Sequence, residues 1–176
     1  MLFIMLVAGS ENVNNVVKVV EGEGGEWKTV VVASGSDFYS YPCALPSSVD
    51  GGEERSCWVE WNHPSMPWDT TSVVVDGVVV EDKGSNGQTR VSTSGELWWI
   101  GDGGGDLYGL RGYVDGKVKR IDLEDEDMKC PSFGWSAGVR SWDFLNGGEE
   151  AVVRCKNQKT GKVRTSSSIC EVCYQL

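Results

Sequence analysis

Two glutamates with tryptophan neighbours are the residues of this sequence best suited to chemistry. Glu60 lies between Trp58 and Trp61, and Glu96 stands two residues before Trp98. Aromatic surroundings raise the pKa of a carboxyl group, and glycoside hydrolases cut a sugar linkage with two such groups. The alternative is a structural role. Residues two apart on a strand share one face, so Glu96 and Trp98 would pack together. Neighbouring residues point to opposite faces, so one tryptophan of the pair 98–99 would lie in the core. A small glycoside hydrolase is the enzyme that the sequence leaves open.

Histidine and cysteine offer little further catalytic chemistry. The chain has one histidine, His63, which lies beside a proline, and we expect no serine nucleophile activated by it. Cys170 and Cys173 have the spacing of a redox or zinc pair, but a zinc site needs a second pair at matching spacing, and the sequence has none. Residues 101–106 match neither a phosphate-binding loop nor an EF-hand, so we expect a turn there. We expect no metal, no cofactor and no catalytic residue.

The six cysteines point to an oxidising compartment. An even number in a chain of this size is typical of three disulfides, and disulfides persist mainly in secreted proteins. Cys43 with Cys57 is the first pair that we expect, because it closes a loop of moderate length. The predicted disulfide cysteines are Cys43, Cys57, Cys130, Cys155, Cys170 and Cys173.

The first ten residues resemble a short or truncated secretory signal. Residues 2–7 are apolar, and Ala8 and Ser10 have the small-residue spacing of a cleavage site, although a basic start is missing. A buried first strand is the alternative. We expect residues 11–176 to form a single domain that follows the possible signal. No other stretch is apolar enough to span a membrane.

The acidic balance of the chain excludes some partners and favours others. Its 26 acidic and 16 basic residues leave a formal net charge of -10, and no basic stripe is present, so we expect no nucleic-acid partner. A soluble, solvated surface is the simplest explanation of the charge. The functional explanation is a basic protein ligand attracted by an acidic run. That run comprises Asp122, Glu124, Asp125, Glu126 and Asp127.

The chain also carries eight tryptophans, which is unusually many for its length. Aromatic rings pack cores, and they also anchor protein interfaces and stack on sugars. We expect most of them in the core and the others in a binding site beside proline-bearing loops at residues 42–54 and 62–71. Together with the acidic run, the predicted ligand-binding residues are Trp58, Glu60, Trp61, Trp68 and Asp69.

Short apolar runs bounded by Gly, Asp, Asn and Ser predict strands almost throughout the chain, and no helix. Asp76-Gly77, Asp115-Gly116 and Asn146-Gly147 lie beside such runs, and these dipeptides favour the tight turns of antiparallel hairpins. So many short strands exceed what one twisted sheet holds. The sequence therefore predicts an all-β fold, an antiparallel β-sandwich of Ig-like or jelly-roll style, stapled by disulfides and carrying long loops with proline and tryptophan.

Together these features favour binding over catalysis. We expect an extracellular, secreted protein that captures a basic protein ligand, in the manner of immune-evasion decoys that sequester cytokines or chemokines. The alternatives are a carbohydrate-binding module or small glycoside hydrolase acting on a glycan, and a structural surface domain.

Overall fold

The computed structural model describes residues 2–8, 13–47, 54–105, 108–121, 128–129, 140–148, 150–157 and 159–168. Antiparallel strands make up most of these residues, and the only helical segments among them are the 3-10 turns η1 (Glu23–Gly25) and η2 (Asn146–Gly148). Within the described ranges, no helix is long and apolar enough to cross a membrane. The predicted all-β antiparallel fold is confirmed.

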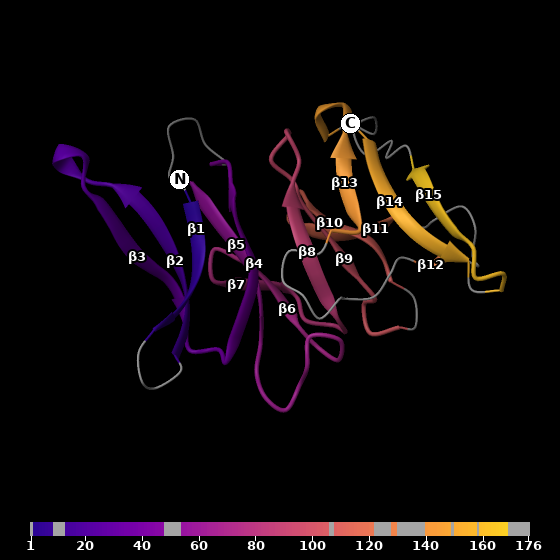
Figure 1. Cartoon of the computed structure of the whole chain (residues 1–176), viewed down its shortest axis with the longest axis horizontal. Helices are drawn as coiled ribbons and strands as arrows, with labels where there is room; N and C mark the ends of the chain where they lie inside the picture. The colour runs from indigo at the N-terminus through magenta and orange to yellow at the C-terminus, as the bar shows by residue number, and fades with distance from the viewer. Residues whose placement is uncertain are drawn as a thin grey trace.

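The strands form four antiparallel sheets that follow one another along the chain (Figure 1). The first sheet contains β1 (Leu2–Ala8), β2 (Val13–Glu21) and β3 (Trp27–Ser34). The second contains β4 (Phe38–Leu45), β5 (Arg55–Trp61), β6 (Ser72–Val75) and β7 (Val78–Glu81). The third contains β8 (Asn86–Val91), β9 (Leu97–Gly101), β10 (Gly109–Val114) and β11 (Lys117–Ile121). The fourth contains β12 (Met128–Lys129), β13 (Trp142–Leu145), β14 (Glu150–Asn157) and β15 (Val163–Ser168).

Tight turns join neighbouring strands, as the dipeptides predict. Asp76 and Gly77 have φ angles of 51° and 78°, and Asp115 and Gly116 have 53° and 74°. Positive φ at both central residues is the type I′ geometry that matches the twist of a hairpin. Asn146 behaves differently, because it begins the 3-10 turn η2 between β13 and β14.

Apolar side chains fill the space between each sheet and the next, so sandwich packing repeats through four sheets. The layer between the first and second sheets is built from Val16, Tyr39, Trp58 and Val74. The layer between the second and third is built from Leu45, Cys57, Val59, Val73, Val75, Leu97 and Trp99. The layer between the third and fourth is built from Trp98, Ile100, Leu110, Val114, Trp142, Ala151, Val153 and Cys155.

This serial packing corrects the expectation for one tryptophan pair. Trp98 and Trp99 point to opposite faces of β9, and the alternation along the strand predicted only one of them in the core. Both are buried, with 2% and 0% of their surface exposed, because the third sheet is covered on both faces. Neither ring is therefore open as a platform for a sugar.

Two further segments differ from the sequence analysis. Residues 42–45 belong to β4 and not to a loop, and Pro42 is accommodated there because the β4–β5 register is interrupted between Ser40 and Cys43. Residues 2–8, considered as a signal, form β1 and pair with β2 along its length. Whether this segment is removed, and whether residues 11–176 act as one domain, stay predictions.

Candidate functional site

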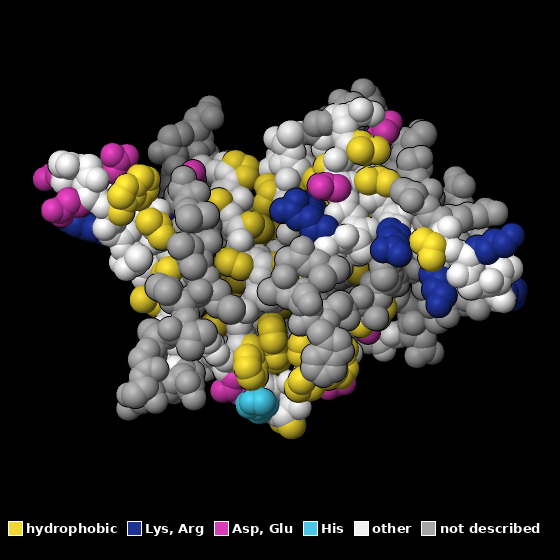
Figure 2. Space-filling view, viewed as in Figure 1, with side chains coloured by type: hydrophobic (Ala, Val, Ile, Leu, Met, Phe, Trp, Pro, Cys, Tyr) yellow, Lys and Arg dark blue, Asp and Glu magenta, His cyan; other side chains and the backbone are white. Residues whose placement is uncertain are grey.

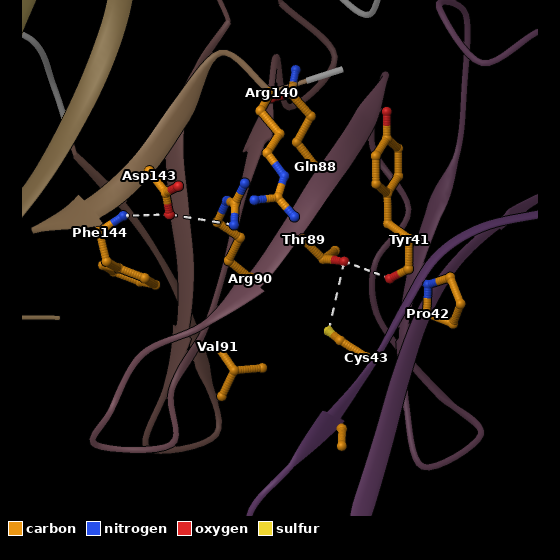
Figure 3. Close-up of a pocket in the computed structure, with 11 residues that line it drawn as sticks. Tyr41, Pro42, Cys43, Gln88, Thr89, Arg90, Val91, Arg140, Asp143 and Phe144 are labelled. Atoms are coloured by element: carbon orange, nitrogen blue, oxygen red, sulfur yellow. Dashed lines mark hydrogen bonds and ion pairs between the residues drawn. The ribbon is translucent and has the colours of Figure 1, made fainter. Parts of the chain in front are cut away.

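A cavity lies where β4 and β8 meet the residues that lead into β13 (Figure 3). Strands β4 and β8 are edge strands of the second and third sheets, and they contact each other. The cavity has a volume of about 550 Å³, which lies in the range of small-molecule sites. Its lining consists of Tyr41, Pro42, Cys43, Ala44, Gln88, Thr89, Arg90, Val91, Arg140, Asp143 and Phe144.

Both edge strands are bulged at the cavity. The β4–β5 register shifts between Ser40 and Cys43, and the β8–β9 register shifts between Gly87 and Arg90. Within these bulges Tyr41 and Gln88 have φ angles of 49° and 56°, in the left-handed region that non-glycine residues seldom occupy. Bulges and strained residues of this kind concentrate at functional sites, because they re-aim side chains.

Hydrogen bonds from three sheets hold the bulges in place. Thr89 Oγ1 donates to the Tyr41 carbonyl oxygen over 2.7 Å, which joins β8 to β4. Gln88 Oε1 accepts from the backbone N–H and the hydroxyl of Ser141, over 2.8 and 3.0 Å. The Gln88 carbonyl oxygen accepts from Trp142 Nε1 over 3.0 Å. The cavity wall is thus a pre-formed junction between the second, third and fourth sheets.

Two arginines give the cavity its charge. Arg90 Nη1 lies 3.3 Å from Asp143 Oδ1, and the Arg90 guanidinium lies over the Trp142 ring, 5.6 Å from its centroid. Burial lowers the pKa of Arg90 below its ordinary value, Asp143 opposes this, and the charge of Arg140 adds to the lowering. Arg140 is exposed and makes no ion pair within the described part of the chain.

A pair of thiols borders the same cavity. Cys43 and Cys57 are partners across β4 and β5, and their Sγ atoms lie 2.8 Å apart. The hydrogen bond with Cys57 lowers the pKa of the Cys43 thiol, against the effect of burial, and Thr89 and Arg90 lower it further. The same hydrogen bond and burial raise the pKa of Cys57 well above its usual value. The predicted partners are therefore adjacent, but they are thiols here, and the disulfide stays a prediction.

The predicted binding residues near β5 lie elsewhere, and some are structural. Trp58 is 3% exposed, and its Nε1 donates to Glu60 Oε2 over 2.7 Å, so its ring packs in the core. Trp61 stacks on Phe38 with ring centroids 5.3 Å apart. Trp68 is half-buried and Asp69 is exposed in the β5–β6 loop, where the Asp69 carboxylate accepts from the backbone N–H of Met66. None of these residues lines the cavity.

Several other predicted residues lie outside the described part of the chain. These are Asp122, Glu124, Asp125, Glu126 and Asp127 of the acidic run, and the cysteines Cys130, Cys170 and Cys173. Cys155 is described and is buried between the third and fourth sheets. Glu96, the other candidate carboxylate, accepts a hydrogen bond from Trp98 Nε1 over 3.3 Å, as expected for residues that share a strand face.

Apart from Cys43, the cavity residues were not predicted from the sequence, although two signals for the bulges were present. Pro42 interrupts a run that otherwise has the pattern of a strand, and proline inside a sheet is confined to edges and bulges. Asn86-Gly87 interrupts the next edge strand, and a glycine within a strand often marks a bulge. No local pattern, however, distinguishes Arg90 and Arg140 from other surface arginines.

Comparison with known proteins places the fold. No family model matches the chain, and no curated protein matches it significantly. A puromycin-hydrolyzing peptidase of Mycobacterium tuberculosis superimposes with a TM-score of 0.59 at 21% identity, over 96% of this chain and 28% of that one. A puromycin hydrolase gives 0.52 at 19% identity, over 80% of this chain and 23% of its own. A mutant puromycin hydrolase complexed with PGG gives 0.57 at 18%, over 78% and 23%.

The chain therefore spans about a quarter of the length of these structures and shares the fold of that section. Successive antiparallel sheets that pack face to face in chain order are the way in which the blades of a β-propeller are arranged. Strands β4 and β8, which border the cavity, are edge strands of two successive sheets.

Proposed function

We propose that this chain is a ligand-binding part of a protein built like the puromycin hydrolases, and that the ligand occupies the cavity between β4, β8 and β13. The chain supplies recognition, and bond cleavage is not its own task. The observation that carries the proposal is the coincidence of a cavity of about 550 Å³ with two bulges, each holding a non-glycine residue at positive φ. Such strain persists only where surrounding contacts enforce it.

The character of the cavity supports binding of a small polar ligand. Apolar surface comes from Pro42, Val91 and Phe144, while Gln88 and Arg140 bring hydrogen-bond donors into the same space. A concave site with apolar walls and a few convergent polar groups is the usual form of a ligand pocket. Hydrogen bonds from three sheets hold this shape before any ligand arrives.

The candidate catalytic residues support recognition over cleavage. His63 is exposed in the β5–β6 loop, where its ring meets the edge of Phe38 with centroids 5.0 Å apart, and it does not line the cavity. Glu60 and Glu96 each accept a hydrogen bond from a tryptophan indole. A carboxylate used in this way positions a buried ring, which is the structural role that the sequence analysis weighed against a glycosidase.

Protection of Cys43 from alkylation tests the proposal, because its thiol lines the cavity. Puromycin and a neutral tripeptide amide serve as probes, and peptide mapping by mass spectrometry reports iodoacetamide labelling at each cysteine. We expect a saturable slowing of Cys43 labelling by at least one probe. Ala44→Trp fills the cavity and should abolish the protection. Val78→Trp, at a position 64% exposed on β7, is the control and should retain it.

Two outcomes of the alkylation experiment would contradict the proposed binding site. If neither probe slows labelling of Cys43, or if the protection survives Ala44→Trp in a protein with unchanged circular dichroism, the cavity is not the binding site and the proposal is wrong.

Capture of a basic protein is a second candidate function, favoured by the tip of the β2–β3 hairpin. Glu21, Glu23 and Glu26 surround this tip, and the Trp27 ring beside them is 68% exposed. Figure 2 shows acidic side chains gathered there. Exposed tryptophan within a charged rim is a common interface anchor.

We expect the double change Glu23→Gln and Glu26→Gln to weaken the salt-sensitive binding of polylysine. Asp82→Asn changes another exposed carboxylate and should leave this binding unchanged.

A further inference from the structure

We propose that the cavity recognises an oxyanion, a carboxylate or phosphate group, held between Arg90 and Arg140. This inference rests on the proposed function, since it names the class of ligand that the same cavity takes. The two residues come from β8 and from the segment before β13, and both line the cavity. Figure 3 shows their guanidinium groups turned toward the same space above Thr89.

Contacts with neighbouring side chains already hold the Arg90 guanidinium in one orientation at this site. Asp143 contacts one edge of its guanidinium at 3.3 Å, and the Trp142 ring lies against its face. Its side chain is only 18% exposed, so few alternative orientations remain. A guanidinium fork that is already oriented loses little conformational entropy when it binds a planar or tetrahedral oxyanion.

The charges around the cavity are unbalanced in favour of an anion. Asp143 is the one carboxylate among the cavity-lining residues, which include two arginines. Like charges repel more strongly near a protein surface than in bulk water, and the effect of Arg140 on the pKa of Arg90 reflects this repulsion. Arg154 joins Arg140 and Asp143 around an adjoining hollow of about 250 Å³, which adds further positive charge. A bound oxyanion would neutralise this excess.

Gln88 is a fixed part of the wall beside the arginines. Its Oε1 already accepts from both the N–H and the hydroxyl of Ser141, so the orientation of the amide is set. The charged N–H donors of the cavity come from Arg90 and Arg140. Charge-assisted bonds from arginine to carboxylate or phosphate are shorter and stronger than bonds between neutral groups.

Titration of the full chain with inorganic phosphate at constant ionic strength tests the inference, by calorimetry and by protection of Cys43 from iodoacetamide. Arg140→Gln removes an exposed charge, so the fold should be kept, and we expect the phosphate affinity to fall by at least about tenfold. Lys119→Gln makes the same change in charge at an exposed position on β11 and should alter the affinity by less than about twofold.

A tripeptide with a free terminal carboxylate, compared with its amide, distinguishes the two sources of the oxyanion. Tighter binding of the acid than of the amide identifies a carboxylate site, and phosphate binding alone identifies a phosphate site. The inference is overturned if neither anion binds better than the amide, or if both variants lose affinity equally. If puromycin or the amide protects Cys43 while no anion does, only this inference fails. If no probe protects Cys43, the proposed function fails with it.

Discussion

At the scale of single residues, the glutamates that the sequence places beside tryptophans act as hydrogen-bond acceptors for buried indole rings. A buried indole N–H needs an acceptor. Trp58 finds Glu60 at 2.7 Å, Trp98 finds Glu96 at 3.3 Å, and Trp99 finds Asn86 Oδ1 at 3.0 Å. A glutamate two residues from a tryptophan on a strand therefore indicates a half-buried hydrogen bond between neighbours on one face.

The thiol pair at the cavity wall leads to a prediction about pH. Because the hydrogen bond from Cys57 lowers the pKa of Cys43, the Cys43 thiolate forms at a lower pH than an ordinary cysteine thiolate does. Labelling of Cys43 by iodoacetamide should thus begin to rise at lower pH than labelling of Cys57. Cys57→Ala removes the hydrogen bond and should shift the Cys43 profile to higher pH. Cys155→Ala is the control, and an unchanged profile in Cys57→Ala would contradict the argument.

The same two residues test the disulfide predicted from the sequence. Oxidised glutathione should accept electrons from both thiols, joining Cys43 to Cys57 and releasing two molecules of reduced glutathione. Their cross-strand register and the 2.8 Å separation of the Sγ atoms support this pairing. Non-reducing peptide mapping should recover the two cysteines in one linked peptide. Recovery of Cys43 only as a mixed disulfide with glutathione would count against it.

At the scale of strands and sheets, close approach across β9 and β10 explains a glycine. Gly112 lies opposite Trp98, and a Cβ at this position would lie 2.7 Å from atoms of the Trp98 ring. That ring is buried between the third and fourth sheets and cannot move aside without disturbing the layer. The absence of a side chain at residue 112 is therefore what allows the tryptophan to lie flat on its neighbour.

Gly112→Ala should accordingly lower the free energy of unfolding by about 1–3 kcal/mol, the usual effect of overpacking a core. Urea denaturation followed by tryptophan fluorescence would measure it. Gly105→Ala is a matched control, because the nearest atom to its Cβ would be the Asp102 carbonyl oxygen at 3.5 Å, an ordinary contact. Equal stability of both variants would show that the Trp98 ring has room to shift.

At the scale of the whole molecule, the sheets depend on one another because each buries apolar surface against the next. A buried ion pair reinforces one of these junctions. Arg111 Nη1 of β10 lies 3.0 Å from Glu81 Oε2 of β7, and the two side chains are only 13% and 11% exposed. Arg111 and Glu81 therefore connect the third sheet to the second through β10 and β7, whereas the cavity is bordered by β4 and β8.

Breaking this pair should destabilise the molecule without touching the binding site. Glu81→Gln leaves the Arg111 charge buried with no anion, which we expect to cost about 3 kcal/mol of unfolding free energy. Arg55→Gln breaks a more exposed pair with Asp76 and should cost at most about 1 kcal/mol. Chemical denaturation measures both, and similar losses in the two variants would contradict the assignment of a buried bridge.

The sequence by itself determined the local structure. Alternating apolar residues predicted most strands, and Asp76-Gly77 and Asp115-Gly116 adopt the positive φ angles that their types favour. These outcomes depend on near neighbours in the chain. The cross-strand meeting of Cys43 and Cys57 was also within reach, because one hairpin's register brings them together.

The tertiary structure alone decided the candidate site. Tyr41, Gln88 and Arg140 belong to three different sheets or their connections. They line one cavity only because β4, β8 and β13 converge in the folded chain. The stacking of four sheets also decided that Trp98 and Trp99 are both buried, because burial depends on what covers the second face of a strand. Periodicity along one strand reports which residues share a face, and only the packing of distant segments shows whether that face meets solvent, a neighbouring sheet or a ligand.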